Sequence, residues 1–487
     1  MVNPRFTSGK VNLSLEQNIS ETENFNDTTT REVHLPRSRR LNLLALTSVI
    51  FFTVSGGAYG LEPLVGAVGA GWAVALVLVT PLLWSLPIAL MVSELSSMMP
   101  EEGGYYVWVR EGLGDFWGVQ EGWWTICYTA VDMAIYPVLF IDYLGYFFPK
   151  ISVDEAQAMS WSIWLTRWLI AVLLIAVACA INWRGARAVG TNAAFNVLVV
   201  LAPFVLLVLF GFLKSGAAHT AASVVVDDLK HRPDNKLLTL GLAIVLWNYC
   251  GWDNVSTFAA EVNDARKNYP RAMMAALPLT VAAYLLPLLA GIAVTTDANV
   301  WSEDAGWPVI GEMIGGSWLG IIITAAALVS AWSLFNSQLL YVSRLPYAMA
   351  RDRWLPLLLA RVSKRTAVPT VALLASCFVS ALFATLSFGK LVILDIMLYA
   401  AALSLEFFAL LALRRSRPEM SRPFRVPGGW PVLFLITIAP TCFAILVFIA
   451  SFQDKSADPR QMLIVCVVIL SGVVIYFTRR RKALKNK

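Results

Sequence analysis

The chain has 487 residues, of which 58% are hydrophobic and only 14% are charged. Soluble domains carry about 25% charged residues, so this composition excludes an ordinary soluble protein and indicates a polytopic membrane protein. The net charge of +6 does not indicate nucleic-acid binding, because the Lys and Arg residues gather in alternate loops between apolar segments, as membrane topology requires. We therefore expect a lipid bilayer around the chain and no nucleic acid as a partner.

Cysteine and histidine positions argue against an enzyme or a metal protein. The six cysteines all fall in apolar segments without close spacing, which predicts neither a disulfide framework nor a zinc site. His34, His219 and His231 lie outside those segments. The apolar segments contain no paired His or Cys-His arrangement and no catalytic motif, so we expect no enzymatic activity and no metal.

The apolar segments are long enough to cross a bilayer. Residues 1–36, in contrast, are polar and lack the apolar core of a signal peptide, which predicts a disordered cytoplasmic tail. A crossing helix needs about 20 apolar residues. Twelve such spans are predicted, at residues 41–68, 72–98, 115–148, 160–182, 191–213, 238–263, 272–296, 317–345, 368–387, 390–413, 430–452 and 460–478.

Basic residues predict the orientation of these spans. Arg37, Arg39 and Arg40 stand directly before the first span, and clusters of Arg and Lys fall in the loops on the same side, whereas the opposite loops carry scattered cations. Because cytoplasmic loops carry the excess of Lys and Arg, we expect both termini in the cytoplasm, including a basic tail at 479–487. The protein is expected to be a multi-pass protein of the cell membrane.

Two of the predicted spans are interrupted. In span 1, Gly56, Gly57 and Gly60 make a continuous helix costly, and a second break falls within residues 247–254 of span 6. A broken helix at membrane depth exposes amide and carbonyl groups, which must be buried in protein or line a cavity. Paired breaks in corresponding positions of two halves indicate the binding site of a secondary transporter.

The breaks also predict the fold. They divide a transporter core, residues 37–414, into five-span units at about 41–213 and 238–413, and residues 415–478 add two further spans. Because five is odd, the second unit enters the membrane from the opposite side. The predicted fold class is an all-α integral membrane protein with 12 transmembrane helices, arranged as a five-plus-five inverted repeat with helices 1 and 6 broken.

Acidic side chains inside the spans are the main candidates for function, because such groups are costly in a membrane. Glu121 and Asp132 of span 3 are eleven residues apart, so they share a helix face about 16 Å apart along the axis. No Lys or Arg lies at comparable depth to neutralise them. Asp132 is at mid-span, where it has no helix end to cap, and this favours a functional role.

The other acids have structural alternatives. Glu62 follows the span 1 break, where an acid can equally stabilise the start of a helix. Asp253 or Asn254 can equally cap the second half of span 6, in which Glu261 also lies.

Several motifs resemble those of the amino acid-polyamine-organocation transporters. They are Val54-Ser55-Gly56-Gly57, Trp84-Ser85-Leu86-Pro87, Ser93-Glu94-Leu95, Gly103-Gly104-Tyr105 and Gln120-Glu121-Gly122. Residues 132–144, Trp247-Asn248, residues 252–257 and Leu405-Glu406-Phe407 are similar, more narrowly, to the polyamine uptake transporters of plants and trypanosomatids. L-type amino acid transporters are similar as well. The resemblance runs from span 1 to span 11 and implies the leucine-transporter-like fold, with a site made by spans 1, 3, 6, 8 and 10.

The resemblance leaves the substrate open. In this superfamily the span 1 break holds the carboxylate of an amino acid and the span 6 break receives its amino group. A polyamine has no carboxylate and needs acids along its pocket, which Glu121, Asp132 and Asp253 would supply. Cys250-Gly251 departs from the plant pattern, and span 8 lacks an acid there. The predicted substrate-binding residues are Ser55, Gly56, Gly57, Gly60, Glu121, Asp132, Tyr136, Trp247, Asn248, Tyr249, Trp252 and Asp253.

The coupling ion, H⁺ or Na⁺, is open too, and we expect no other cofactor. Sodium-coupled members of this fold use hydroxyl groups of span 8, for which Ser330 and Ser333 are candidates; Glu121 or Asp132 would carry a proton. The sequence thus predicts a secondary transporter that moves polyamines or amino acids by alternating access, by proton- or cation-coupled symport. The alternatives are an amino acid uptake system or exchanger without polyamine activity, and a sensor that does not transport.

The loop at 149–160 has no cysteine, so no disulfide-linked heavy chain is expected.

Overall fold

The computed structural model describes residues 40–101, 103–151, 160–213, 217–301, 306–384, 388–453 and 459–485. The predicted N-terminal tail, residues 1–36, lies outside these ranges. Throughout them the ordered structure is helical, apart from two isolated bridges, Leu41 with Val262 and Val362 with Pro369. The all-α prediction is confirmed.

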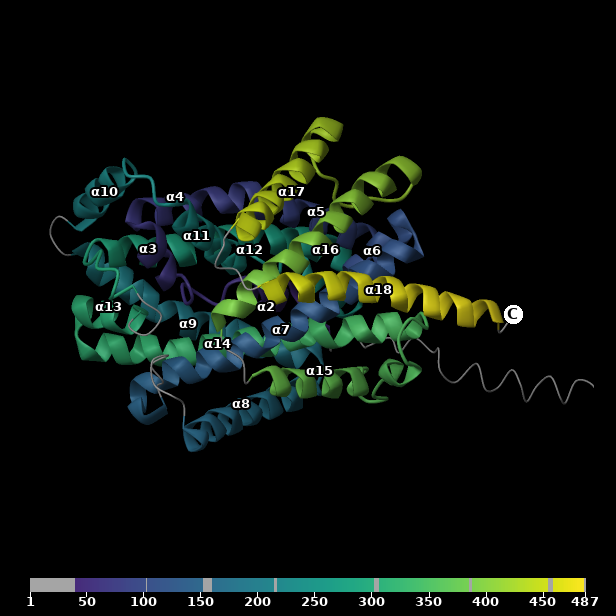
Figure 1. The fold of residues 1–487 in the computed structure, drawn as a ribbon, viewed down its shortest axis with the longest axis horizontal. Coiled ribbons are helices and arrows are strands. Elements are labelled where there is room, and N and C mark those ends of the chain that lie inside the picture. The colour runs from purple at the N-terminus through teal and green to yellow at the C-terminus, as the bar shows by residue number, and fades with distance from the viewer. Residues whose placement is uncertain are drawn as a thin grey trace, which may run out of the picture.

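The helices form one elongated bundle, in which α2 (Leu43–Val54) lies near the middle and α8 (Trp161–Asn182) and α17 (Gly429–Gln453) lie on opposite sides (Figure 1). A π-helical segment, Pro81–Ser85, joins α4 to α5. The helices in chain order are α2 (Leu43–Val54), α3 (Glu62–Val68), α4 (Ala70–Thr80), α5 (Leu86–Met98), α6 (Gly104–Leu113), α7 (Asp115–Phe147), α8 (Trp161–Asn182), α9 (Ala186–Leu213), α10 (Ala217–Asp228), α11 (Asn235–Asn248), α12 (Ala265–Ile292), α13 (Gly306–Gly315), α14 (Ser317–Arg351), α15 (Thr370–Phe383), α16 (Phe388–Ser416), α17 (Gly429–Gln453) and α18 (Pro459–Lys485).

Every predicted span coincides with one of these helices or with two segments around a break. Among the described residues, six continuous segments are long and apolar enough to cross a membrane: Ala70–Met98, Asp115–Phe147, Trp161–Asn182, Ala188–Leu213, Ala265–Ile292 and Ser317–Arg351. Shorter apolar helices lie at Leu43–Val54, Thr370–Phe383 and Gly429–Phe443. These segments support a multi-pass membrane protein, and the count of twelve crossings and the inverted repeat stay predictions.

The break in span 1 is present. α2 ends at Val54 and α3 begins at Glu62, and Gly56, Gly57 and Gly60 between them have φ angles of 75°, 100° and 86°. Such left-handed values are open to glycine but cost other residues about 1–2 kcal/mol. The glycines therefore allow the chain to leave the helix and re-enter it within the bundle.

Span 6 differs from the prediction beyond its break. α11 ends at Asn248, and two 3₁₀ turns, at 254–257 and 259–261, replace the expected second helical half. The Gly103 N–H donates to the carbonyl of Thr257, the last residue of the first turn, at 2.9 Å. The Leu41 N–H donates to the carbonyl of Glu261, the last residue of the second turn, also at 2.9 Å. Backbone groups of this segment are thus satisfied by distant segments, which removes the need for an α-helix.

Glu261 lies in a predicted span and is therefore a candidate functional acid, but it forms a buried ion pair. Arg344 Nε of α14 donates to Glu261 Oε1 at 2.7 Å, and both side chains are buried. The arginine lies inside the bundle because α14 continues to Arg351, beyond the predicted end of span 8. Glu261 therefore has its own cation and holds two segments together.

A second buried cluster joins α5 to α16. Glu94 accepts hydrogen bonds from Arg414 Nε at 2.8 Å and from the Val426 N–H at 2.8 Å, and Arg422 Nε lies 3.4 Å from the same carboxylate. Removing one partner of a buried ion pair leaves an uncompensated charge and costs about 3–5 kcal/mol.

We therefore expect Glu94→Gln to lower the free energy of unfolding by about 3–5 kcal/mol, measured by thermal unfolding of the purified protein in detergent. Asp264→Asn is the matched control, because Asp264 pairs with Lys267 at 3.5 Å on the exposed surface, where an ion pair contributes little. Equal melting temperatures for the two variants would contradict this role of Glu94.

Candidate functional site

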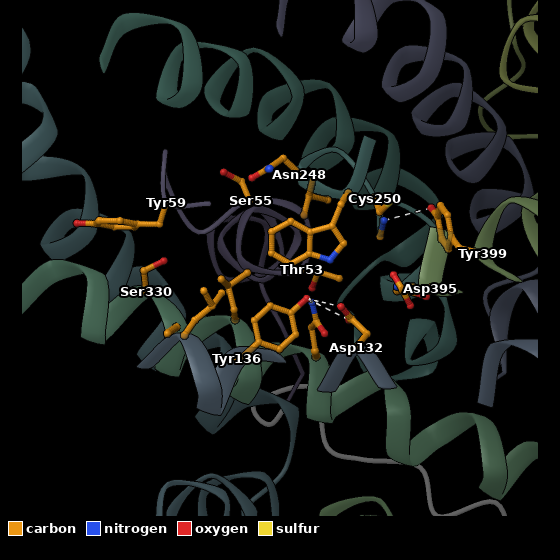
Figure 2. A pocket seen from close by; sticks show the side chains of 18 of the residues that line it. Thr53, Ser55, Tyr59, Asp132, Tyr136, Asn248, Cys250, Ser330, Asp395 and Tyr399 are labelled. Atoms are coloured by element: carbon orange, nitrogen blue, oxygen red, sulfur yellow. Dashed lines mark hydrogen bonds between the residues drawn. The ribbon is translucent and has the colours of Figure 1, made fainter. Parts of the chain in front are cut away.

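The two breaks open into one pocket (Figure 2). It is lined by the end of α2, by residues 247–254 around the span 6 break, and by side chains of α7, α14 and α16. These elements are spans 1, 3, 6, 8 and 10, the set that the family resemblance implies. The predicted site residues that line the pocket are Ser55, Asp132, Tyr136, Trp247, Asn248 and Ser330.

The glycine break packs closely against α14. A Cβ on Gly56 would lie 2.7 Å from Ser330 Oγ, and the Ser330 hydroxyl donates a hydrogen bond to the Gly56 carbonyl. Ser330 thus stands beside the span 1 carbonyls. Ser333 donates to the Val329 carbonyl at 2.6 Å and accepts from Asn196 of α9 at 2.7 Å, so it contacts a neighbouring helix instead of the break.

The two remaining glycines of the break have different neighbours. Asn248 Nδ2 donates to the Gly60 carbonyl at 3.1 Å, which ties the span 1 break to the span 6 break. Gly57 faces α9, where an added Cβ would lie 3.0 Å from a methyl group of Val200, and it does not line the pocket.

Two carboxyl groups face the pocket, Asp132 of α7 and Asp395 of α16, and they interact electrostatically. Both Asp132 oxygens accept a hydrogen bond from the Tyr136 hydroxyl at 3.0 Å, and Asp132 also accepts one from the Trp247 side chain. Gln338 in turn donates to the Tyr136 hydroxyl. Asp395 Oδ1 has no hydrogen-bond partner among the described residues. Among the described residues, no Lys, Arg or His lines the pocket, so the carboxyl groups are available for a cation.

Aromatic rings form much of the remaining wall. Tyr128, Tyr136 and Tyr143 come from α7, Tyr399 comes from α16, and Trp247 comes from the end of α11. Aromatic faces attract ammonium groups by cation–π interaction, worth up to about 2 kcal/mol where water is excluded. Carboxylates and rings together make a pocket suited to an organic cation.

Two predicted aromatic residues lie outside the pocket. Tyr249 is buried, donates to the Val77 carbonyl at 3.0 Å and packs against Tyr284 with ring centroids 5.1 Å apart. Trp252 is also fully buried and does not line the pocket.

The remaining acids also lie apart from the pocket wall. Glu62 accepts from the Gly60 N–H at 2.7 Å and the Tyr143 hydroxyl at 2.8 Å, so it joins the span 1 break to α7. Asp253 makes no capping bond and instead accepts from the Tyr399 hydroxyl. Glu121 accepts from Thr125 Oγ1 at 3.1 Å and does not line the pocket.

Sequence reasoning missed Asp395, Gln338 and Tyr399. Asp395 stands alone in the apolar run 391–397 of span 10, and an isolated acid in such a run is a signal that could have identified it. Gln338 and Tyr399 give no comparable signal, because amide and tyrosine side chains are common in membrane helices and only helix packing turns them inward.

A broken-helix pocket inside an apolar bundle is the site architecture of carrier proteins. The family model for amino acid permeases matches residues 41–482. The chain belongs to this amino acid permease family. As a permease it is a membrane transporter, and its relatives are transporters, not enzymes.

Several curated proteins are similar to this permease over most of its length. A probable polyamine transporter of Arabidopsis thaliana is 34% identical over 444 residues, which are 90% of this chain and 87% of the relative. Polyamine transporter PUT1 of Oryza sativa subsp. japonica is 35% identical over 415 residues, covering 85% and 74%. The serine/threonine exchanger SteT of Bacillus subtilis is 26% identical over 409 residues, covering 81% and 86%.

Proposed function

We propose that this permease is a secondary active transporter of polyamines, which it carries by alternating access in symport with H⁺ or another cation. The observation that supports this substrate is the pair Asp132 and Asp395 in a pocket to which the described part of the chain contributes no basic residue. Each carboxylate can meet one ammonium group, and the surrounding tyrosines shield the pair from water. The similarity to proteins named polyamine transporters points the same way.

An amino acid is the second candidate substrate. The glycine break of span 1 and the similarity to a serine/threonine exchanger favour it. Against it, the break amides already have acceptors: the Gly57 N–H donates to Ser55 Oγ at 3.1 Å and the Gly60 N–H to Glu62 Oε2 at 2.7 Å. A carboxylate would have to displace these bonds, whereas an ammonium group needs none of them.

We place the transporter in the cell membrane with both termini in the cytoplasm, because the charged loops follow the positive-inside pattern. We propose no disulfide-linked heavy chain, since the loop at 149–160 has no cysteine in its sequence; residues 152–159 of that loop lie outside the described part of the chain.

Uptake into proteoliposomes tests the proposal. Radiolabelled putrescine and spermidine are compared with arginine and leucine, under an inward proton gradient, an inward sodium gradient or neither. We expect the polyamines to accumulate with one gradient and to lose accumulation when that gradient is dissipated. Accumulation of amino acids alone would contradict a polyamine substrate. Saturable spermidine binding without accumulation would instead indicate a sensor.

A further inference from the structure

Three buried acids lie behind the pocket and have no part in its wall: Glu121 of α7, Asp253 after the span 6 break, and Glu406 of α16. Their exposed fractions are 0%, 2% and 0%. The Asp253 and Glu406 side chains are adjacent and interact, and Glu121 interacts electrostatically with both. We refer to Glu121, Asp253 and Glu406 as the acidic cluster.

Within the described part of the chain, no cation neutralises the acidic cluster. None of its members forms an ion pair with a Lys, Arg or His of the described residues. The titratable groups that face it are neutral ones, carried by the break and by three of the helices packed around it. They are Tyr105 of α6, Tyr128 of α7, Tyr399 of α16 and Cys250, with Tyr341 of α14 next to Tyr105 and Tyr128.

Several polar atoms in and around the cluster have no hydrogen-bond partner among the described residues. Across the described residues, neither oxygen of Glu406 receives a hydrogen bond from an N–H or O–H group, and Glu121 Oε2 and the Tyr105 hydroxyl also lack partners. An ionised carboxylate only accepts hydrogen bonds, so two carboxyl groups bond to each other only when one of them carries a proton. Burying several ionised carboxylates together without a counter-charge is also very costly.

A metal ion is a poorer occupant. The described residues contain no group of three or more His, Cys, Asp or Glu side chains arranged to hold a metal. A proton needs only the contact between Asp253 and Glu406.

We infer that the acidic cluster binds a coupling proton, held between Asp253 and Glu406. The coupling role rests on the proposed transport function. Tyr399 links the two sites: it lines the pocket, donates a hydrogen bond to Asp253 and accepts one from the Gly251 N–H at 3.1 Å. Figure 2 shows Tyr399 on the Asp395 side of the pocket, beside the span 6 break. Protonation of Asp253 therefore changes the bonding of a residue that touches the substrate.

The arrangement favours symport of proton and amine. The substrate neutralises Asp132 and Asp395, which line the pocket, but it does not reach Glu406. Only a proton removes the charge there. Because moving an uncompensated charge through a low-dielectric interior is costly, the transporter changes conformation most easily when both amine and proton are bound.

Glu406→Gln tests the inference, because glutamine keeps the shape and cannot ionise. In proteoliposomes we expect spermidine binding and spermidine counterflow to persist. Spermidine accumulation driven by a proton gradient should fall about tenfold, which is a typical size for the coupling between two binding sites. Spermidine-driven proton influx should fall by the same factor. Glu419→Gln, at an exposed position after α16, is the control and should behave as the wild type. Unchanged accumulation and proton influx in Glu406→Gln would overturn the inference.

Infrared spectroscopy of the full-length purified protein tests the proton directly, without transport. We expect the wild type to show the carbonyl-stretch band of a protonated carboxyl group at neutral pH, and Glu406→Gln or Asp253→Asn to lose it. A band unchanged in both variants would overturn the proton site. If the variants lose the band but the wild type accumulates no amine, the proton site stands and the proposed transport function fails.

Tyr399→Phe provides a second variant should Glu406→Gln fail to fold. It removes the hydroxyl that donates to Asp253, and such a bond favours the ionised carboxylate. The pH profile of spermidine uptake should therefore shift to higher pH. A profile that keeps the wild-type midpoint would contradict the coupling of Asp253 to the pocket.

Discussion

Replacing Asp132 by Asn lowers the rate of spermidine uptake at low substrate concentration by about 100-fold or more. The expected size follows from the loss of one charge partner in a buried pocket, which costs about 3–5 kcal/mol, where every 1.4 kcal/mol is about tenfold. Asparagine preserves the volume and can keep the contact with Tyr136. The measurement is initial uptake of radiolabelled spermidine into proteoliposomes, normalised to the amount of reconstituted protein.

Asp142→Asn is the matched control for this prediction. Asp142 lies two to three helical turns further along α7, is half exposed, and pairs with Arg167 at 2.6 Å. The same chemical change there should alter uptake by less than about twofold, because exposed ion pairs contribute little. If Asp132→Asn keeps wild-type uptake, the amine does not use Asp132, and Asp395 alone would have to hold it.

Replacing Gly251 by Ala is expected to reduce uptake about 100-fold, the size of loss known from enzymes when a site is displaced by about 1 Å. Gly251 has a φ angle of 92°, and an added Cβ would lie 2.7 Å from the carbonyl oxygen of Thr53. That oxygen belongs to the backbone at the end of α2, so it cannot rotate away as a side chain would. The two breaks must move apart, and the pocket between them changes shape.

Gly114→Ala separates this steric effect from backbone strain. Gly114 has a φ angle of 94°, nearly the same as Gly251, but an added Cβ there would meet no atom within 4 Å. Both alanine variants place a side chain at a positive φ angle, which costs about 1–3 kcal/mol, and only Gly251→Ala pushes two segments apart. We expect Gly114→Ala to lose thermal stability and keep uptake per folded molecule. Equal losses of uptake in both variants would show that strain alone is responsible.

Local properties of the chain were enough to predict the long apolar helices and the two breaks, but not the 3₁₀ turns that follow the second break. Apolar runs of about 20 residues mark membrane helices because each polar group exposed to lipid adds its own free-energy cost. The glycines at 56, 57 and 60 mark the first break because their conformational freedom belongs to each residue alone. Asp132 could be singled out in the same way, as a costly group at mid-span.

Tertiary packing decided which side chains meet. Glu121 and Asp132 share a face of α7, yet only Asp132 lines the pocket, because the α7 side chains in the pocket wall begin at Tyr128, about two turns beyond Glu121. Glu261 meets Arg344 and Glu406 meets Asp253 across segments far apart in the chain. Such pairings depend on the rotation and depth of whole helices, which result from many weak contacts distributed over the bundle. Hydropathy and local backbone preference carry no information about them.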